Sequence, residues 1–252
     1  MDILFLGRKK YAADMLEWTV AQGHNVIAVV TDNHIPSSPT AARSKALKIP
    51  VIDICQAEDL VAKINIDIAI SYLYWRKIKE PIITCPRFGC INFHPAILPD
   101  WKGVAGYNIA ILNKLSEWGV SAHVVDKEID TGPIIKVFRF NFDYRFETAL
   151  SLEKKTQEIQ CELYKSVLAD IHNNDGLSGS FISNEGGMYI SRKEMLEMMK
   201  ICPDEDIALK VRAFWYPPHH GAFIEINGEK YTLIDDLILQ QISTMYTKSY
   251  SN

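Results

Sequence analysis

The order of hydrophobic and polar residues in the first half of the chain predicts alternating strands and helices. Short apolar runs rich in β-branched residues predict strands at 3–6, 25–30 and 67–71. Apolar residues at helical spacing predict helices at 11–22, 39–47 and 57–64. Strands separated by helices at this spacing need crossover connections, which place helices on both faces of a parallel sheet. We therefore predict an α/β fold with a Rossmann-like, doubly wound and mostly parallel sheet.

The same pattern continues with a further strand, a helix and two adjacent apolar runs. The strand ends near His94, and the helix follows at 107–115. The two runs, at 120–126 and 133–140, are separated by a turn at 129–132. We expect these runs to form a hairpin-like edge of the sheet.

The pattern of predicted elements changes after residue 176. A long amphipathic segment predicts a helix at 145–173, and the sequence Asn-Asn-Asp-Gly is a strong signal for its end. Beyond it the pattern predicts, in order, a loop at 177–188, a short helix at 204–213 and a β-hairpin at 221–233. We predict a main domain at 1–176 and a small helix-plus-hairpin extension at 177–252.

The predicted hairpin turns at Asn227-Gly228, the strongest short-range hairpin signal. A lone two-stranded hairpin is only marginally stable in water. It is therefore expected to pack on the main domain or on a second subunit, and we expect a homodimer.

Two polar residues, Asn92 and His94, interrupt the apolar run that precedes Pro95. Residues two apart on a strand point to the same face of the sheet. Leaving either polar group buried without a partner costs roughly 1–3 kcal/mol. The carboxyl ends of such strands are where α/β proteins bind ligands. We interpret the pair as functional.

Composition and charge narrow the classes of partner. A net charge of −4 and a pI near 6.0 argue against long nucleic acids held mainly by phosphate contacts. No apolar run is long enough for a membrane span, and the N-terminus reads as the first strand and not as a signal peptide. The five cysteines include no Cys-x-x-Cys pair, which favours a reducing cytoplasm and argues against disulfides or a zinc site. We expect a cytoplasmic protein without a metal.

Two loops carry further candidate chemistry. Asp130 lies in the turn that ends at Gly132, where it is either a turn-forming residue or a carboxylate held beside a ligand. The segment after the first strand contains Gly7, Lys9 and Lys10 near a predicted helix N-terminus. It is either an anion site or a solvated loop. A dinucleotide-binding glycine fingerprint is absent, which removes the main support for a nicotinamide dehydrogenase.

Taken together, these positions resemble the formyltransferases that use N10-formyltetrahydrofolate. The resemblance covers roughly residues 1–140 and rests on Asn92-x-His94-Pro95, Leu98-Pro99-x-x-Lys-Gly103, His123 and Asp130-x-Gly132. It implies that Asn92, His94 and Asp130 are catalytic, that His123 supports them, and that the formyl donor is the folate. It also implies folate contacts from Trp75, Arg76, Ile78, Asp126 and Asp130.

The chemistry of formyl transfer suits these residue types. A neutral amine attacks the formyl carbon, and the tetrahedral intermediate carries negative charge on oxygen. An amide and an imidazole on one strand face can donate to that oxygen. The amine must also lose a proton, which Asp130, or His94 supported by it, can take. No metal is required for this reaction.

The acceptor amine is suggested by resemblance to nucleotide-sugar N-formyltransferases. The element Gly106-Tyr107-Asn108 after the Leu-Pro segment and the aromatic tail at 212–223 are similar to that group. The resemblance implies substrate contacts from Gly103, Tyr107 and Asn108. Lys9 and Lys10 join them as the candidate anion site, and Arg212, Trp215 and Tyr216 as a guanidinium suited to a diphosphate and rings suited to a base or sugar. The substrate would be a dTDP-amino-dideoxyhexose for surface polysaccharide such as lipopolysaccharide O-antigen.

Alternatives remain open at this point. Within formyl chemistry they are glycinamide ribonucleotide or another small amine as acceptor, and hydrolysis of the formyl folate. Methionyl-tRNA is disfavoured by the acidic charge and by the short segment after residue 176. From another class comes a catalytically inactive module that binds folate or nucleotide sugar. The aromatic residues of the tail can equally pack the tail onto the main domain or form a dimer interface.

Overall fold

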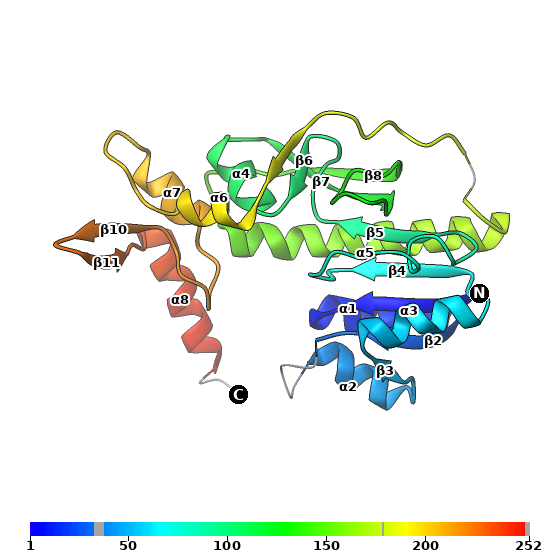
Figure 1. Ribbon diagram of the computed structural model, residues 1–252. Helices are drawn as coiled ribbons and strands as arrows, with labels where there is room; N and C mark the ends of the chain where they lie inside the picture. The colour runs from blue at the N-terminus through cyan, green and yellow to red at the C-terminus, as the bar shows by residue number, and fades with distance from the viewer. Residues whose placement is uncertain (33–37, 178, 250–252) are drawn as a thin grey trace. The chain divides into compact units, whose positions relative to one another are not determined.

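A seven-stranded sheet in the order β3-β2-β1-β4-β5-β7-β8 organises the fold (Figure 1). The computed structural model describes residues 1–32, 38–177 and 179–249. The strands of this sheet are β1 (Asp2–Gly7), β2 (Asn25–Val30), β3 (Val51–Ile52), β4 (Ile68–Tyr72), β5 (Cys90–His94), β7 (Glu117–Val124) and β8 (Ile134–Asn141). Strands β3, β2, β1, β4 and β5 pair in parallel, whereas β5 and β7 are antiparallel. The predicted α/β fold with a mostly parallel sheet is confirmed.

Helices cover both faces of this sheet. The helices of the first half and the long helix are α1 (Lys9–Ala21), α2 (Pro39–Ala46), α3 (Ile54–Lys63), α4 (Gly106–Leu112) and α5 (Ala149–Asn174). Helix α3 begins at a capping box in which Asp53 and Gln56 satisfy each other's backbone amides. One hydrophobic cluster joins the strands to α1 and α5, and a second joins them to α3. This two-sided burial explains the apolar strand runs.

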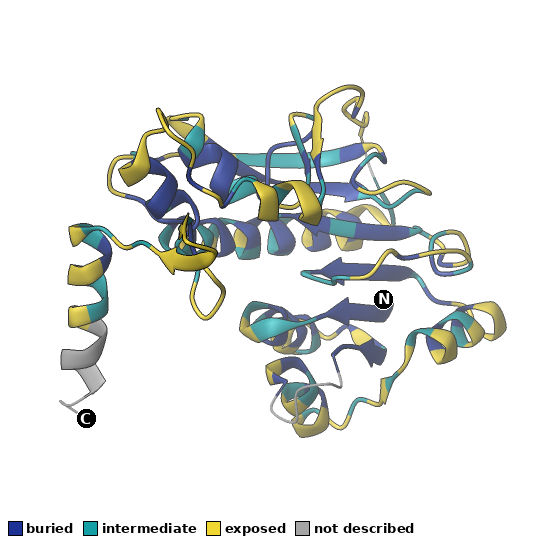
Figure 2. Ribbon diagram, turned by 60° about the vertical axis from the view of Figure 1, so that its left-hand side comes forward, coloured by how far each residue is buried: buried dark blue, intermediate teal, exposed yellow. Residues whose placement is uncertain are grey.

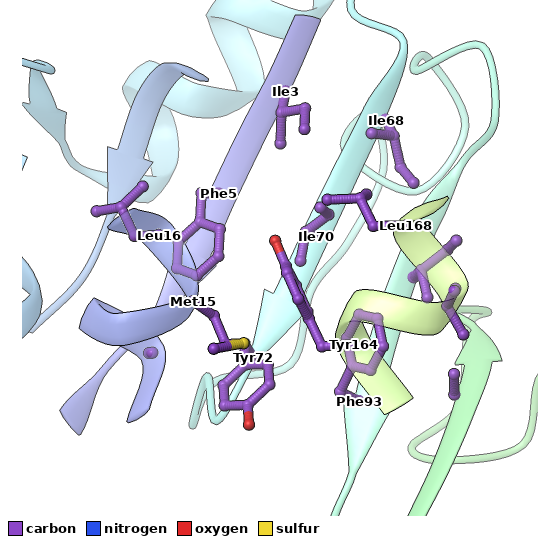
Figure 3. Packing of buried hydrophobic residues seen from close by; sticks show 14 of the residues in the cluster. Ile3, Phe5, Met15, Leu16, Ile68, Ile70, Tyr72, Phe93, Tyr164 and Leu168 are labelled. Atoms are coloured by element: carbon purple, nitrogen blue, oxygen red, sulfur yellow. The ribbon is translucent and has the colours of Figure 1, made fainter. Parts of the chain in front are cut away.

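Large side chains fill the cluster on the face of α1 and α5 (Figure 3). The Tyr164 ring of α5 lies 4.9 Å from that of Phe93 and 5.6 Å from that of Tyr72, between ring centroids. All three side chains are at most 2% exposed. The packing holds β4 and β5 firmly at the point where both strands end. The central strands are buried along most of their length (Figure 2).

The remaining elements are shorter. They are β6 (Trp101–Gly103), β9 (Met188–Ile190), α6 (Arg192–Glu197), α7 (Ile207–Ala213), β10 (Phe223–Ile226), β11 (Glu229–Thr232) and α8 (Asp236–Ser249). Strands β10 and β11 form the predicted hairpin, and β6 pairs with β9. Elements β3, β6, β9, α6 and α8 were not predicted. Residues 179–187 of the predicted loop contain only an isolated bridge at Ile182, and residue 178 lies outside the described part.

The chain divides into two compact units. The first contains Met1–Asp100, Val120–Phe138 and Gln157–Gly187, and the second contains Trp101–Gly119, Arg139–Thr156 and Met188–Asn252. We refer to them as unit 1 and unit 2. The division at residue 176 stays a prediction. Among the described residues, no helix has both the length and the apolarity to cross a membrane.

The histidine between α1 and β2, His24, is expected to make stability depend on pH. Burial lowers the pKa of His24 below 6.5, and the positive N-terminus and His172 add to the effect. The unfolded chain then binds a proton at a higher pH than the folded chain. The free energy of unfolding is therefore expected to fall as pH drops below about 6.5. Urea unfolding from about pH 5 to about pH 8 measures this slope, which is expected to be smaller in His24→Gln.

The matched control is His220→Gln, which removes an exposed histidine of unit 2. It is expected to leave the pH dependence of stability unchanged. Equal slopes in the wild type and His24→Gln would contradict the assignment.

Candidate active site

Three neighbouring strands of unit 1 place polar side chains in a row. Ser71 of β4 is in register with Asn92 of β5, and Asn92 is in register with His123 of β7. Their neighbours Ala69 and Cys90, two positions earlier on β4 and β5, belong to the cluster on the α3 face. The alternation of a strand therefore puts the row on that same face. This register converts residues distant in sequence into neighbours.

Hydrogen bonds connect the row. Ser71 Oγ donates to Asn92 Oδ1 at 2.7 Å, and Asn92 Nδ2 lies 3.1 Å from His123 Nε2. His123 Nδ1 lies 2.9 Å from the carbonyl oxygen of Val124. Asn92 is half-buried, whereas Ser71 and His123 are only 3% and 2% exposed. The amide of Asn92 is therefore the member of the row that retains access to a ligand.

Asp130 reaches this row from the loop between β7 and β8. Its φ of 56° lies in the left-handed region, where Asp and Asn are better tolerated than most residues. Gly132 is required beside it, since a Cβ there would lie 1.9 Å from the carbonyl oxygen of Val124. Asn184 Nδ2 donates to the backbone oxygens of Asp130 at 3.0 Å and Gly132 at 2.7 Å. The loop thus holds the Asp130 carboxylate in one place.

The Asp130 carboxylate lies close to three other polar side chains. Oδ1 lies 3.4 Å from Asn92 Nδ2 and 3.4 Å from His123 Nε2, and Oδ2 lies 3.4 Å from His94 Nδ1. His94 is 6% and Asp130 8% exposed. The structure therefore brings Asn92, His94 and Asp130 together. The arrangement offers amide and imidazole donors beside a carboxylate able to accept a proton. Their catalytic role stays a prediction.

The residues proposed for the folate lie in several environments of unit 1. Trp75 and Arg76 line a cavity of about 290 Å³ at the carboxyl ends of β2 and β3, together with Thr31, Asp53, Gln56 and Tyr74. The Trp75 ring contacts the guanidinium groups of Arg8 and Arg76, at 5.2 and 5.4 Å from its centroid. Ile78 is buried in the cluster on the α3 face, so hydrophobic packing accounts for it. Ligand contacts from all these residues stay predictions.

Asp126 has a clear local role. Its Oδ1 accepts from Thr131 Oγ1 at 2.6 Å and from the Glu128 amide at 3.2 Å. These bonds shape the loop that carries Asp130. A direct folate contact from Asp126 stays a prediction.

The two lysines at the start of α1 also stay candidates. Lys9 begins the helix with a φ of 70°, and the exposed Lys10 pairs with Asp14 at 2.9 Å. Asp14 raises the pKa of Lys10 by hydrogen bonding and by charge. An anionic ligand at Lys10 would compete with this carboxylate.

Three candidates of unit 2 lie around β6 and α4. Gly103 has a φ of 80°, and a Cβ there would lie 2.5 Å from the carbonyl oxygen of Ile190, so the β6–β9 pairing requires glycine. Asn108 is 9% exposed and donates to the Ala213 carbonyl oxygen at 2.6 Å. It therefore ties α4 to α7. Tyr107 is half-buried on α4. Substrate contacts from these residues stay predictions.

The aromatic segment of unit 2 has an adjacent cavity. Trp215 lines a cavity of about 410 Å³ together with Leu150, Ser151, Lys154, Leu237 and Gln240. Tyr216 stacks on His219, with ring centroids 5.7 Å apart. The Arg212 guanidinium pairs with Asp235 at 3.3 Å, while its Nε has no hydrogen-bond partner among the described residues. Neither this cavity nor the one beside Trp75 is lined by Asn92, His94 or Asp130.

Sequence reasoning missed Ser71 and Asn184. Ser71 carried the same signal as Asn92, a polar residue in an apolar strand, but its place at the predicted strand end made it unremarkable. Asn184 lies in an irregular loop, and nothing in the sequence connects it to the turn 54 residues earlier. In the part of the chain that is described, no group of three or more His, Cys, Asp or Glu side chains is arranged so that it could hold a metal ion.

Comparison with known proteins now gives the family. The family model described as "Formyl transferase" matches residues 1–168. The chain belongs to the formyl transferase family. The resemblance to formyltransferases that rested on Asn92, His94 and Asp130 is therefore confirmed for the family. The protein is a formyltransferase, as expected.

Individual relatives of this formyltransferase carry different names. It is 29% identical over 250 residues to a methionyl-tRNA formyltransferase of Thermotoga neapolitana, covering 92% of this chain and 78% of that protein. It resembles the crystal structure of a 4-N formyltransferase from Francisella tularensis with a TM-score of 0.78 and 23% identity, covering 93% and 96% of the two chains.

A second solved structure is similar in fold. It is an N-formyltransferase of Helicobacter canadensis in complex with folinic acid and dTDP-3-aminofucose. Its TM-score is 0.69 at 24% identity, and the match covers 90% of this chain and 85% of that one. Both solved structures are less than 25% identical to this chain, so the similarity shows that the three proteins share a fold.

Proposed function

We propose that this formyltransferase transfers the formyl group of N10-formyltetrahydrofolate to the amino group of a nucleotide-linked amino sugar, of the dTDP-amino-dideoxyhexose type. The donor is the co-substrate of the family to which the chain belongs. The observation that carries the reaction is the convergence of Asn92 and His94 on the Asp130 carboxylate, each at 3.4 Å. A protein that only binds folate has no use for an oxyanion site beside a base.

The reaction follows from these groups. The amine lone pair attacks the formyl carbon, and the electrons of the carbonyl bond move to its oxygen. Asn92 Nδ2 and the His94 ring donate to that oxygen, a kind of donor worth about 10²–10³ in rate. Asp130 takes the proton of the amine, directly or through His94; in the second case the His94 ring donates to the oxygen once it carries that proton. The intermediate collapses when the electron pair on oxygen re-forms the carbonyl, the bond from carbon to N10 breaks, and N10 receives the proton that was taken from the amine, which releases tetrahydrofolate.

The sugar acceptor is supported by the solved structures that resemble nearly the whole chain. Their names describe a 4-N formyltransferase and an N-formyltransferase with dTDP-3-aminofucose. The aromatic ring of Trp215 beside a cavity of about 410 Å³ is suited to a base or sugar ring. In this proposal the enzyme is a cytoplasmic homodimer that supplies surface polysaccharide, such as lipopolysaccharide O-antigen.

A second candidate is formylation of methionyl-tRNA, which the name of the Thermotoga relative favours. One experiment separates the two. The protein is incubated with N10-formyltetrahydrofolate and either a dTDP-amino sugar or methionyl-tRNA, and the products are identified by mass spectrometry. A gain of one formyl group on the sugar supports the proposal, and its gain on methionyl-tRNA supports the second candidate. Release of free formate alone indicates a hydrolase, and no turnover with bound folate indicates a binding module.

The assignment of Trp215 makes a separate prediction. Stacking of a base on an aromatic ring contributes about 1–3 kcal/mol, so Trp215→Ala is expected to raise the KM for the dTDP-amino sugar roughly 5- to 150-fold. The KM for the folate is expected to stay near its wild-type value. Steady-state kinetics with each substrate varied in turn measures the split.

Phe146→Ala is the control, because Phe146 is a 67% exposed aromatic residue of the same unit. It is expected to leave both KM values unchanged. A Trp215→Ala enzyme that changes only its oligomeric state would show that the ring belongs to a subunit interface.

A further inference from the structure

The row formed by Ser71, Asn92 and His123 begins with a buried hydroxyl that the proposed reaction does not use. Ser71 is the fourth of the five buried residues of β4, and its side chain is 3% exposed. A polar group at such a position is costly to bury without a partner. The Ser71 hydroxyl finds this partner in Asn92, because its Oγ donates to Asn92 Oδ1 at 2.7 Å.

Two acceptors beside the row, the Val124 carbonyl and the Asp130 carboxylate, indicate the direction of its bonds. The Val124 oxygen can only accept, so His123 Nδ1, 2.9 Å away, carries a hydrogen. In the uncharged ring Nε2 is then an acceptor, and Asn92 must present its Nδ2 at 3.1 Å. The Asp130 carboxylate lies 3.4 Å from Asn92 Nδ2 and can only accept a hydrogen bond, so it favours the same orientation of the amide.

This direction leaves Asn92 Oδ1 for Ser71. Two partners therefore hold the nitrogen of the amide, and Ser71 holds its oxygen. In the rotated amide, the oxygen would face the Asp130 carboxylate and the lone pair of His123 Nε2, which is electrostatically unfavourable. Among these contacts, the bond from Ser71 is the one that fixes the oxygen end of the amide.

We propose that Ser71 is a positioning residue for formyl transfer, which acts by fixing the Asn92 amide so that a hydrogen of Nδ2 points at the developing oxyanion. The proposal rests on the proposed function of Asn92. The contact of Nδ2 with Asp130 is the longer of its two, at 3.4 Å against 3.1 Å with His123. The Nδ2 hydrogen that faces Asp130 is therefore the one that donates to the substrate oxygen in this proposal. Ser71 itself touches neither substrate.

The kinetic test compares Ser71→Ala with Ser71→Thr and with Ser44→Ala. Ser44 is a fully buried serine of unit 1 whose Oγ donates to the Ile49 carbonyl oxygen at 2.8 Å, so its variant loses an equivalent bond outside the site. In Ser71→Ala, kcat is expected to fall on the order of 10- to 100-fold, because the donor is misplaced and not deleted. The KM values are expected to stay near wild type. Ser71→Thr, which keeps the hydroxyl, is expected to recover most of the loss.

A second readout does not depend on turnover. The side-chain amide signals of Asn92, identified by their loss in Asn92→Ala, are followed by nuclear magnetic resonance in the ¹⁵N-labelled full chain. Faster exchange of these hydrogens with solvent is expected in Ser71→Ala and not in Ser44→Ala. A kcat for Ser71→Ala equal to that of Ser44→Ala, or unchanged exchange, would overturn the proposal. Altered exchange with no formyl transfer even in the wild type would instead place the failure in the proposed function.

Discussion

Replacing Asp130 by Asn is expected to remove most of the turnover while leaving the fold intact. The variant loses the base that accepts the proton of the amine, a contribution of about 10²–10⁴ in rate. Asn tolerates the left-handed φ of 56° at this position, and the bond from Asn184 goes to the backbone oxygen and is kept. The loss is expected in kcat. Steady-state formyl transfer to the dTDP-amino sugar measures it, and calorimetric titration with tetrahydrofolate checks that the folate still binds.

Glu128→Gln is the matched control for this change. It neutralises a carboxylate of the same loop, but the Glu128 side chain is 75% exposed and pairs with Lys77 at 3.2 Å. Its turnover is expected to equal that of the wild type. Near wild-type turnover in Asp130→Asn would remove Asp130 from the mechanism, whatever the geometry around it.

The sheet was predictable because its strands are buried on both faces. Runs such as those of β1, β2 and β4 are almost continuously apolar, and the helices between them keep a regular spacing. The elements that were missed are mostly too short to carry a period. Strand β3 has two residues, and β6 and β9 have three each. Their existence depends on partners distant in sequence.

The candidate site was predictable where a residue contradicts its surroundings. Asn92 and His94 stand out because polar groups in a core strand need a purpose, and Asp130 stands out through the family pattern around its turn. Register was not predictable in the same way. The alignment of Ser71 with Asn92, and of Asn92 with His123, follows from how β4, β5 and β7 pair. A single sequence does not contain that pairing, so the bonds that orient the amide emerge only from the structure.

Asn92→Ala is expected to produce the second large loss. The variant deletes a donor to the tetrahedral intermediate, and donors of this kind contribute about 10²–10³ in rate. Because the oxyanion develops only after attack, the loss is expected in kcat and not in the KM of either substrate. Asn92 lies in the middle of β5 but is only half-buried, so truncation leaves room for water and the fold is expected to survive. Steady-state kinetics measures the effect, and thermal unfolding confirms the fold.

A companion variant, Asn92→Asp, separates the loss of the hydrogen-bond donor from the loss of side-chain volume. Aspartate has nearly the shape of asparagine and can still accept from Ser71, but it replaces the nitrogen that lies 3.4 Å from Asp130 Oδ1 by an oxygen. Two carboxyl groups so close disfavour each other's charge. Turnover is expected to fall at least as far as in Asn92→Ala. The control Asn174→Ala, which removes an exposed amide of unit 1 bonded to the Asp170 carbonyl oxygen, is expected to be fully active. If Asn92→Asp were active at neutral pH, shape alone would suffice, and the amide would have no part in stabilising the oxyanion.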